Sequence, residues 1–234
     1  MSKYDKEFAN WQQILPTNLP VSFTAFDPDS GQTDRVACYG CPGYALNDLL
    51  ATFPKRLRIK IGIAEGANYD QIPTEPYAQF FVEGVEPQNG DTMIERLAWI
   101  ANPPFLSEGF AGPDSGVDEI PSEGALLFLM GWLETNYADI ANAFDGLNPK
   151  TNQVQRVRYY TFSEEESQKI FNLVENNLNN SMLYIYMGKT IAVSMHPMEF
   201  RPVVEVRINE TADDNGGGGG SHFFDFSNPC PPFC

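Results

Sequence analysis

The chain has 234 residues, 42% of them hydrophobic and 13% aromatic, and this composition excludes a globally disordered protein. Its 31 acidic residues outnumber 15 basic ones, so the formal net charge at pH 7 is −16. A field of that sign repels nucleic acid and anionic lipid, so we expect neither a nucleic-acid partner nor a membrane partner.

The opening residues predict a short amphipathic helix, because Phe8, Trp11 and Ile14 fall at near-helical spacing before Pro16. This N-terminus lacks an apolar core of signal-peptide length. The longest nearly uncharged apolar run, at 124–133, has about ten residues, whereas a bilayer span needs about twenty. We therefore expect a cytoplasmic protein, in which reduced thiols are the default.

Strands dominate the next part of the chain. Residues 21–26 and 35–40 flank the turn-forming stretch DPDSGQT and predict a β-hairpin. Residues 44–53 predict a helix of about three turns, closed by the proline that follows. Strict alternation of apolar and basic residues over 56–66 gives the clearest strand, and 77–85 predicts another.

Two further helices are predicted around a long loop. Residues 91–101 combine an Asp N-cap with apolar residues at helical spacing. After the irregular stretch 103–120, a strong helix is expected from about Ser122 to Phe144, with Leu126, Met130 and Tyr137 on its buried stripe. The first half of this helix is apolar almost all round, which predicts central burial.

The last third predicts a strand, a helix and three strands. Residues 154–162 form the strand, and Ser163 with Glu166 forms a capping box for the helix. A hairpin around Gly188 and Lys189 and a strand at 200–209 follow. This order predicts an α+β fold, with helices packed on one face of a mainly antiparallel sheet and a flexible C-terminal tail.

The composition changes abruptly near residue 210. We expect one α+β globular domain over 1–210, an acidic, glycine-rich linker over 211–220 and a separate peptide over 221–234. Prolines stiffen this peptide, and its rings are costly to leave in water, so it suits docking on a protein partner. The residues expected to contact that partner are Phe223, Phe224, Phe226, Pro231 and Phe233.

Two other interpretations of the peptide remain open. It can fold back and cover a hydrophobic groove on its own body, or it can be processed or modified while the body serves as a carrier. The leading hypothesis is a non-enzymatic interaction protein, because no catalytic residues are indicated by motif or spacing. An enzyme that uses carboxylates of the 103–120 loop has no support from spacing.

The four cysteines suggest a second hypothesis, a thiol-dependent protein. Cys38 and Cys41 have C-x2-C spacing, while Cys230 and Cys234 have C-x3-C spacing. Four thiolates would complete a tetrahedral zinc site, and Cys38 with Cys41 alone would suit a redox dithiol just before a helix. The simpler alternative is a pair of partly buried structural cysteines, with no cofactor.

Overall fold

The computed structural model describes residues 3–27, 31–88, 92–104, 120–148, 153–189, 200–209, 220–225 and 227–230, with the backbone alone at 147–148 and 227–230. Within these residues the α+β class is confirmed, and every strand pair is antiparallel. The sequence predicts one main sheet, whereas the structure contains two five-stranded sheets and two short two-stranded ones.

The first five-stranded sheet is built on two long central strands. Its strands are β4 (Arg56–Ile63), β5 (Ala78–Val85), β6 (Ile94–Arg96), β10 (Tyr159–Phe162) and β14 (Ser227–Cys230). They lie in the order β14-β10-β4-β5-β6. The strands predicted at 56–66 and 77–85 are confirmed as β4 and β5.

The second sheet faces the first. Its strands are β3 (Cys38–Pro42), β7 (Ala98–Trp99), β11 (Ser181–Lys189), β12 (Phe200–Ile208) and β13 (Gly220–Phe224). They lie in the order β13-β12-β11-β3-β7. The strand predicted at 200–209 is confirmed as β12.

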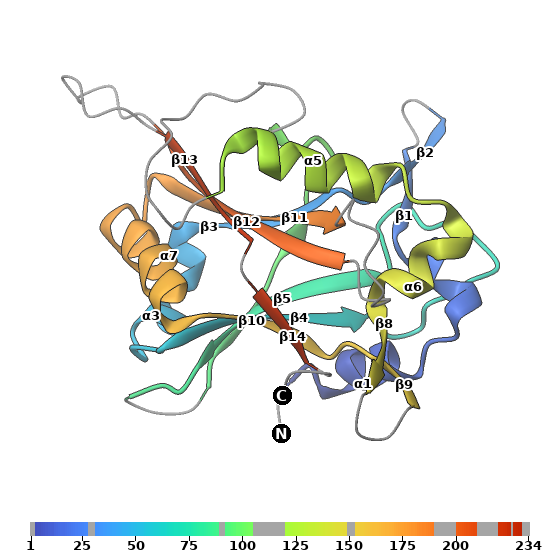
Figure 1. Cartoon of the computed structure of the whole chain (residues 1–234), viewed down its shortest axis with the longest axis horizontal. Helices are drawn as coiled ribbons and strands as arrows, with labels where there is room; N and C mark the ends of the chain where they lie inside the picture. Colours follow the sequence, from blue (N-terminus) through green and yellow to red (C-terminus); the bar gives the residue numbers. More distant parts are fainter. Residues whose placement is uncertain are drawn as a thin grey trace.

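Two segments cross between the sheets, one at each end of the strand orders. Figure 1 shows β13 and β14, which belong to different sheets, in red. Strands β6 and β7 are separated only by Leu97, whose amide donates to the carbonyl of Phe80 at 2.9 Å. At the opposite margin, β13 ends at Phe224 and β14 begins at Ser227. The two sheets are therefore joined along both edges by the covalent chain.

The hydrophobic core lies between the sheets. Leu57, Ile59, Ile61 and Ile63 of β4 are almost completely buried, because alternate residues of a strand face the same side. The core is rich in aromatic rings, which prefer offset-stacked or edge-to-face contacts. The ring of Tyr39 on the second sheet stacks on Phe80 of the first, with centroids 4.6 Å apart, so this pair ties the sheets together.

Helix α1 (Asp5–Gln13) confirms the predicted N-terminal helix and packs against β4. Its Trp11 is fully buried in the main core, and the indole Nε1 donates to the carbonyl of Val157 at 2.6 Å. This hydrogen bond satisfies the one polar group of a side chain that is otherwise held by apolar contacts.

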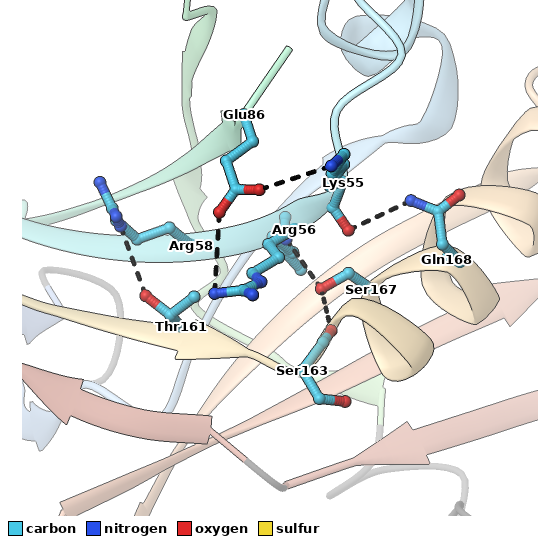
Figure 2. Close-up of polar contacts among 9 residues, drawn as sticks. Lys55, Arg56, Arg58, Glu86, Thr161, Ser163, Ser167 and Gln168 are labelled. Atoms are coloured by element: carbon cyan, nitrogen blue, oxygen red, sulfur yellow. Dashed lines mark hydrogen bonds and ion pairs between the residues drawn. The ribbon is translucent and has the colours of Figure 1, made fainter. Parts of the chain in front are cut away.

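Helix α7 (Glu164–Asn176) begins at the predicted capping box. The hydroxyl of Ser163 accepts from the amide of Glu166 at 3.2 Å, and the Glu166 carboxylate accepts from the amide of Ser163 at 3.3 Å. Figure 2 shows Ser163 and Ser167 beside β4. Because Ser167 Oγ accepts from the amide of Leu57 at 2.8 Å, the capped end of the helix is fixed to the sheet.

The single helix predicted from Ser122 to Phe144 is wrong. Helix α5 (Ser122–Leu133) ends first, and the 3-10 turn η3 (Tyr137–Asp139) leads into helix α6 (Ile140–Phe144). The guanidinium of Arg35 donates to the carbonyls of Trp132 and Thr135, at 2.8 Å for Trp132. A side chain distant in sequence thus satisfies carbonyls that a longer helix would use itself.

The predicted buried stripe of this segment is correct only in part, since Leu126 is partly buried and packs against the core whereas two other members face solvent. Helix α5 lies over the outer face of the second sheet (Figure 1), and it buries Ala125, Leu129 and Trp132. Met130 and Tyr137 are exposed. An apolar composition all round left the helix without a unique face, and contact with β11 selected the buried one.

Two local predictions are corrected by strand pairing. The helix predicted at 91–101 is instead β6 and β7, because this segment completes an edge of each sheet. The hairpin predicted around Gly188 is absent, since Gly188 lies within β11 opposite Arg201. A Cβ at Gly188 would collide with the carbonyl of Arg201, so the glycine serves close strand packing rather than a turn.

The remaining elements are short. The predicted first hairpin is shifted: β1 (Thr24–Asp27) pairs with β2 (Gln32–Arg35), and the chain then leaves for β3. The helix predicted at 44–53 is reduced to one turn of α-helix. The other short elements are η1 (Pro16–Asn18), α2 (Leu19–Ser22), η2 (Gly43–Leu46), α3 (Asn47–Leu50), β8 (Asp145–Asn148) and β9 (Gln153–Arg156).

Candidate functional site

The C-terminal peptide lies along its own body as two strands. Strand β13 pairs with β12, and β14 pairs with β10. Phe224 is fully buried in the core between the sheets, whereas Phe223 is 5% exposed and packs in a second cluster beneath α5. These two predicted partner-contact rings therefore contact the chain itself in this structure. Phe226, Pro231 and Phe233 lie outside the described residues.

A buried carboxylate attaches β13 to β12. Glu205 is fully buried, and it accepts hydrogen bonds from Tyr186 Oη at 2.6 Å and Arg207 Nε at 2.8 Å. The hydroxyl of Ser221 on β13 also donates to this carboxylate. Burial raises the pKa of Tyr186 above its usual value, which keeps the phenol protonated as a donor. With three donors satisfying Glu205, this cluster is a structural attachment.

The structure places Cys38 and Cys41 on opposite faces of β3. Cys38 packs in the cluster beneath α5, and Cys41 packs in the core between the sheets. Residues three apart in an extended strand point to opposite sides, so the C-x2-C spacing forms no knuckle here. Burial raises the pKa of Cys38 well above its usual value and that of Cys41 to about 12. Both thiols are free.

The other two cysteines are not brought to this pair by the described backbone. Cys230 is opposite Tyr159 in the first sheet, whereas Cys38 and Cys41 belong to the second. Cys234 lies outside the described residues. Among the side chains that the structure describes, no group of three His, Cys, Asp or Glu is placed to hold a metal ion. The four-cysteine zinc site remains a prediction from the sequence.

A pocket of about 340 Å³ opens where the chain crosses from the first sheet to the second through β6 and β7. Its walls come from β3, from the end of the loop before β5, from β5 itself and from residues 96–99. A strand that leaves one sheet to join another creates a wedge between them, and this wedge is the corner pocket. Its volume is near the lower end of the roughly 300–1,000 Å³ typical of ligand sites.

Three polar side chains line the corner pocket. Gln79 is 8% exposed, and its Oε1 is buried without a hydrogen-bond partner. Arg96 and Glu75 are exposed, and neither makes an ion pair within the described part of the chain. Within the described part of the chain, a buried carboxamide, a cation without an ion pair and an anion without an ion pair therefore line a single small cavity.

Aromatic rings form the inner wall of the corner pocket. Trp99 is half-buried and lies opposite Tyr39 in the pairing of β7 with β3. Tyr39 is fixed, because its hydroxyl donates to the carbonyl of Ala78 at 2.6 Å and its ring stacks on Phe80. Burial raises the pKa of Tyr39 well above its usual value, although the nearby Arg96 opposes this. The phenol of Tyr39 therefore stays neutral and held in place, which suits a rigid wall rather than a general acid or base.

The lining of the corner pocket combines charged groups with apolar walls. Among its described residues there is no serine, cysteine, lysine or histidine. Glu75 is exposed, and it is the one carboxylate among these described lining residues. The apolar residues Pro76 and Leu97 complete a wall that can cover the hydrocarbon part of a small ligand.

The sequence analysis did not single out any residue of this pocket. Arg96 and Trp99 were assigned to a helix, so their position at a sheet edge could not be foreseen. Gln79 did leave a signal: it is an uncharged polar residue inside the otherwise apolar stretch YAQFFV, where a buried strand side chain is expected.

No protein-family model, curated protein or solved structure matches this chain. Within the described residues, no helix has both the length and the apolar character that a membrane crossing requires.

Proposed function

We propose that this chain is a non-enzymatic binding protein whose corner pocket holds a small organic ligand. The observation that carries the proposal is the side chain of Gln79, which lines a cavity and whose buried Oε1 has no hydrogen-bond partner among the described residues. A buried polar atom without a partner costs about 1–3 kcal/mol, and a ligand in the adjacent cavity could recover this cost.

The chemistry of the lining defines the ligand. Rotation of the Gln79 side chain would bring its buried carboxamide to a hydrogen-bond donor on the ligand, and an anionic group can pair with the guanidinium of Arg96. A flat or branched apolar body suits the ring of Trp99 and the fixed ring of Tyr39. This combination of an apolar wall with a few convergent polar groups is typical of small-molecule sites.

The proposal is tested by substitution of Gln79→Leu. Without ligand, the variant should be more stable than wild type, because it removes an unsatisfied buried acceptor. With ligand, it should bind about tenfold or more weakly, since about 1.4 kcal/mol corresponds to a factor of ten. The measurement is thermal unfolding with and without millimolar L-phenylalanine, 3-phenylpropionate, phenethylamine, adenosine or glucose.

Fluorescence gives an independent readout. Trp11 and Trp132 are fully buried, so a ligand in the corner pocket should change the emission of Trp99 alone. Gln88→Leu, at an exposed glutamine outside the pocket, is the matched control and should behave as wild type. If no compound of the panel shifts the unfolding temperature or the Trp99 emission, the proposed function is rejected.

The protein partner expected for the C-terminal peptide, like the cytoplasmic location, remains a separate prediction. The burial of Phe223 and Phe224 favours the alternative in which the peptide covers its own body. Capture of a partner by the full chain that is lost with Phe233→Ala, a position outside the described residues, would support partner docking.

A further inference from the structure

We infer that the ligand of the corner pocket is a free α-amino acid with an apolar side chain. This inference rests on the proposed function and adds the ligand class to it. It is carried by two opposite charges, Glu75 and Arg96, that make no ion pair among the described residues and line one cavity together with Gln79.

The two charges are complementary to a zwitterion. Glu75 and Arg96 line the same 340 Å³ pocket, yet no ion pair joins them to each other or to another described residue. An α-carboxylate can take two parallel hydrogen bonds from the guanidinium of Arg96. An α-ammonium has three donors, which suit the carboxylate of Glu75 and the unused acceptor of Gln79.

The charge of the whole chain separates a zwitterion from a simple anion. With 31 acidic and 15 basic residues, the protein repels an anion before that anion reaches Arg96. A ligand with no net charge meets no such long-range barrier. The net negative charge would attract a simple amine, but an amine has no carboxylate to pair with Arg96.

The aromatic wall accounts for the side chain. Trp99 and Tyr39 lie opposite each other across paired strands, and Pro76 and Leu97 extend this apolar surface within the pocket. Burial of an apolar side chain here removes hydrocarbon surface from water, which favours the bound state. A polar side chain would lose its hydration against this wall without new hydrogen bonds.

The experiment compares four probes on the full chain by isothermal titration calorimetry. L-phenylalanine carries both charges, 3-phenylpropionate lacks the ammonium, phenethylamine lacks the carboxylate, and N-acetyl-L-phenylalanine has a neutral amide. We expect L-phenylalanine to bind at least tenfold more tightly than each of the other three. L-leucine, which keeps both charges and an apolar side chain, should bind within tenfold of L-phenylalanine.

Substitution assigns each charge to its partner. Arg96→Gln should weaken L-phenylalanine binding by about 10–100-fold and leave phenethylamine unaffected, while Glu75→Gln should weaken L-phenylalanine and leave 3-phenylpropionate unaffected. Both residues are exposed, so the variants should fold. Arg158→Gln, at an exposed arginine that is not part of the pocket lining, is the matched control.

The outcomes distinguish the two proposals. If 3-phenylpropionate or phenethylamine binds as tightly as L-phenylalanine, and Gln79→Leu abolishes that binding, then the pocket binds a small ligand and the amino-acid inference is overturned. If L-phenylalanine binds but Glu75→Gln and Arg96→Gln have no effect, the inference is also overturned. If none of the probes binds, the inference fails, and the proposed function then depends on the rest of its panel.

Discussion

Buried polar residues in this protein differ in how far their hydrogen-bonding groups are satisfied. Glu205 has three donors and holds the C-terminal strand in place. Gln79 and Asp225 each retain a buried oxygen without a partner. Because unsatisfied buried groups reduce stability, these positions respond to substitution differently from Glu205. For Gln79 we propose that ligand binding offsets the lost stability. For Asp225 we expect the lost stability to depend on pH.

Asp225 should destabilise the folded chain at neutral pH. It follows β13, and its burial raises the pKa of its carboxyl from the ordinary value of 3.8, with Arg201 only partly opposing this. The folded state then binds a proton more tightly than the unfolded state, so the contribution of Asp225 to stability is greatest below pH 3.8 and is lost as the pH rises through the folded pKa.

Asp225→Asn should therefore raise the free energy of unfolding at pH 7 and change it much less near pH 4. Urea unfolding of both proteins across this range measures the difference, in which the other titrating groups cancel. A variant that is equally or less stable than wild type at pH 7 would show that the charged carboxylate is not costly at this position.

The two cysteines of β3 should be unreactive in the folded protein. Cys38 and Cys41 are buried on opposite faces, and with raised pKa values almost no thiolate is present at pH 8. In a Cys230→Ser/Cys234→Ser variant, a thiol reagent such as DTNB should label both residues only after guanidinium unfolding. Rapid labelling of two thiols in the native protein would contradict this prediction and support the dithiol hypothesis.

Among the secondary-structure elements, the C-terminal strands differ most from what the sequence predicts. The sequence separates 221–234 from the body, whereas β13 and β14 extend one edge of each sheet. Strand addition satisfies backbone groups that an exposed edge would leave unpaired. These strands thus complete the sheets that they join.

Removal of β13 and β14 should destabilise the whole body. Deletion of residues 220–234 exposes the edges of β12 and β10 and removes Phe224 from the core. The single substitution Phe224→Ala should lower the free energy of unfolding by about 3–5 kcal/mol, as for other fully buried aromatic residues.

The matched control for this prediction is Phe53→Ala, because Phe53 is 54% exposed and its truncation should cost much less. Chemical denaturation of wild type, the truncated chain and the two alanine variants gives the comparison. If the truncated chain keeps the stability of wild type, then the tail is a separate peptide, as the sequence analysis expects.

At the scale of the whole molecule, one core serves two sheets that the chain joins along both margins. One crossing, at 94–99, leaves the corner pocket, and the other, at 220–230, is filled by Phe224. The formal net charge of −16 makes the approach of an anionic ligand unfavourable. The pocket is therefore a consequence of the crossing, and the proposed selectivity depends on the charges of Glu75 and Arg96 in its lining.

The predictability of each element follows the range of the forces that form it. The strands at 56–66 and 77–85 and the capped helix after Ser163 were predicted correctly, because alternation and capping are local signals. The segment 91–101 was predicted wrongly, because its local pattern favours a helix whereas pairing with an edge of each sheet makes it extended. The candidate site depends on this same segment, so the sequence could not reveal it.

By itself, the sequence determined the α+β class, the acidic surface and the main strands, which follow from composition and from contacts within a few residues along the chain. Only the tertiary structure decided that there are two sheets, that the C-terminal peptide belongs to both, and that Gln79, Arg96 and Glu75 share a pocket. These features join residues far apart in the sequence, and their energy comes from burial and pairing that no local pattern encodes.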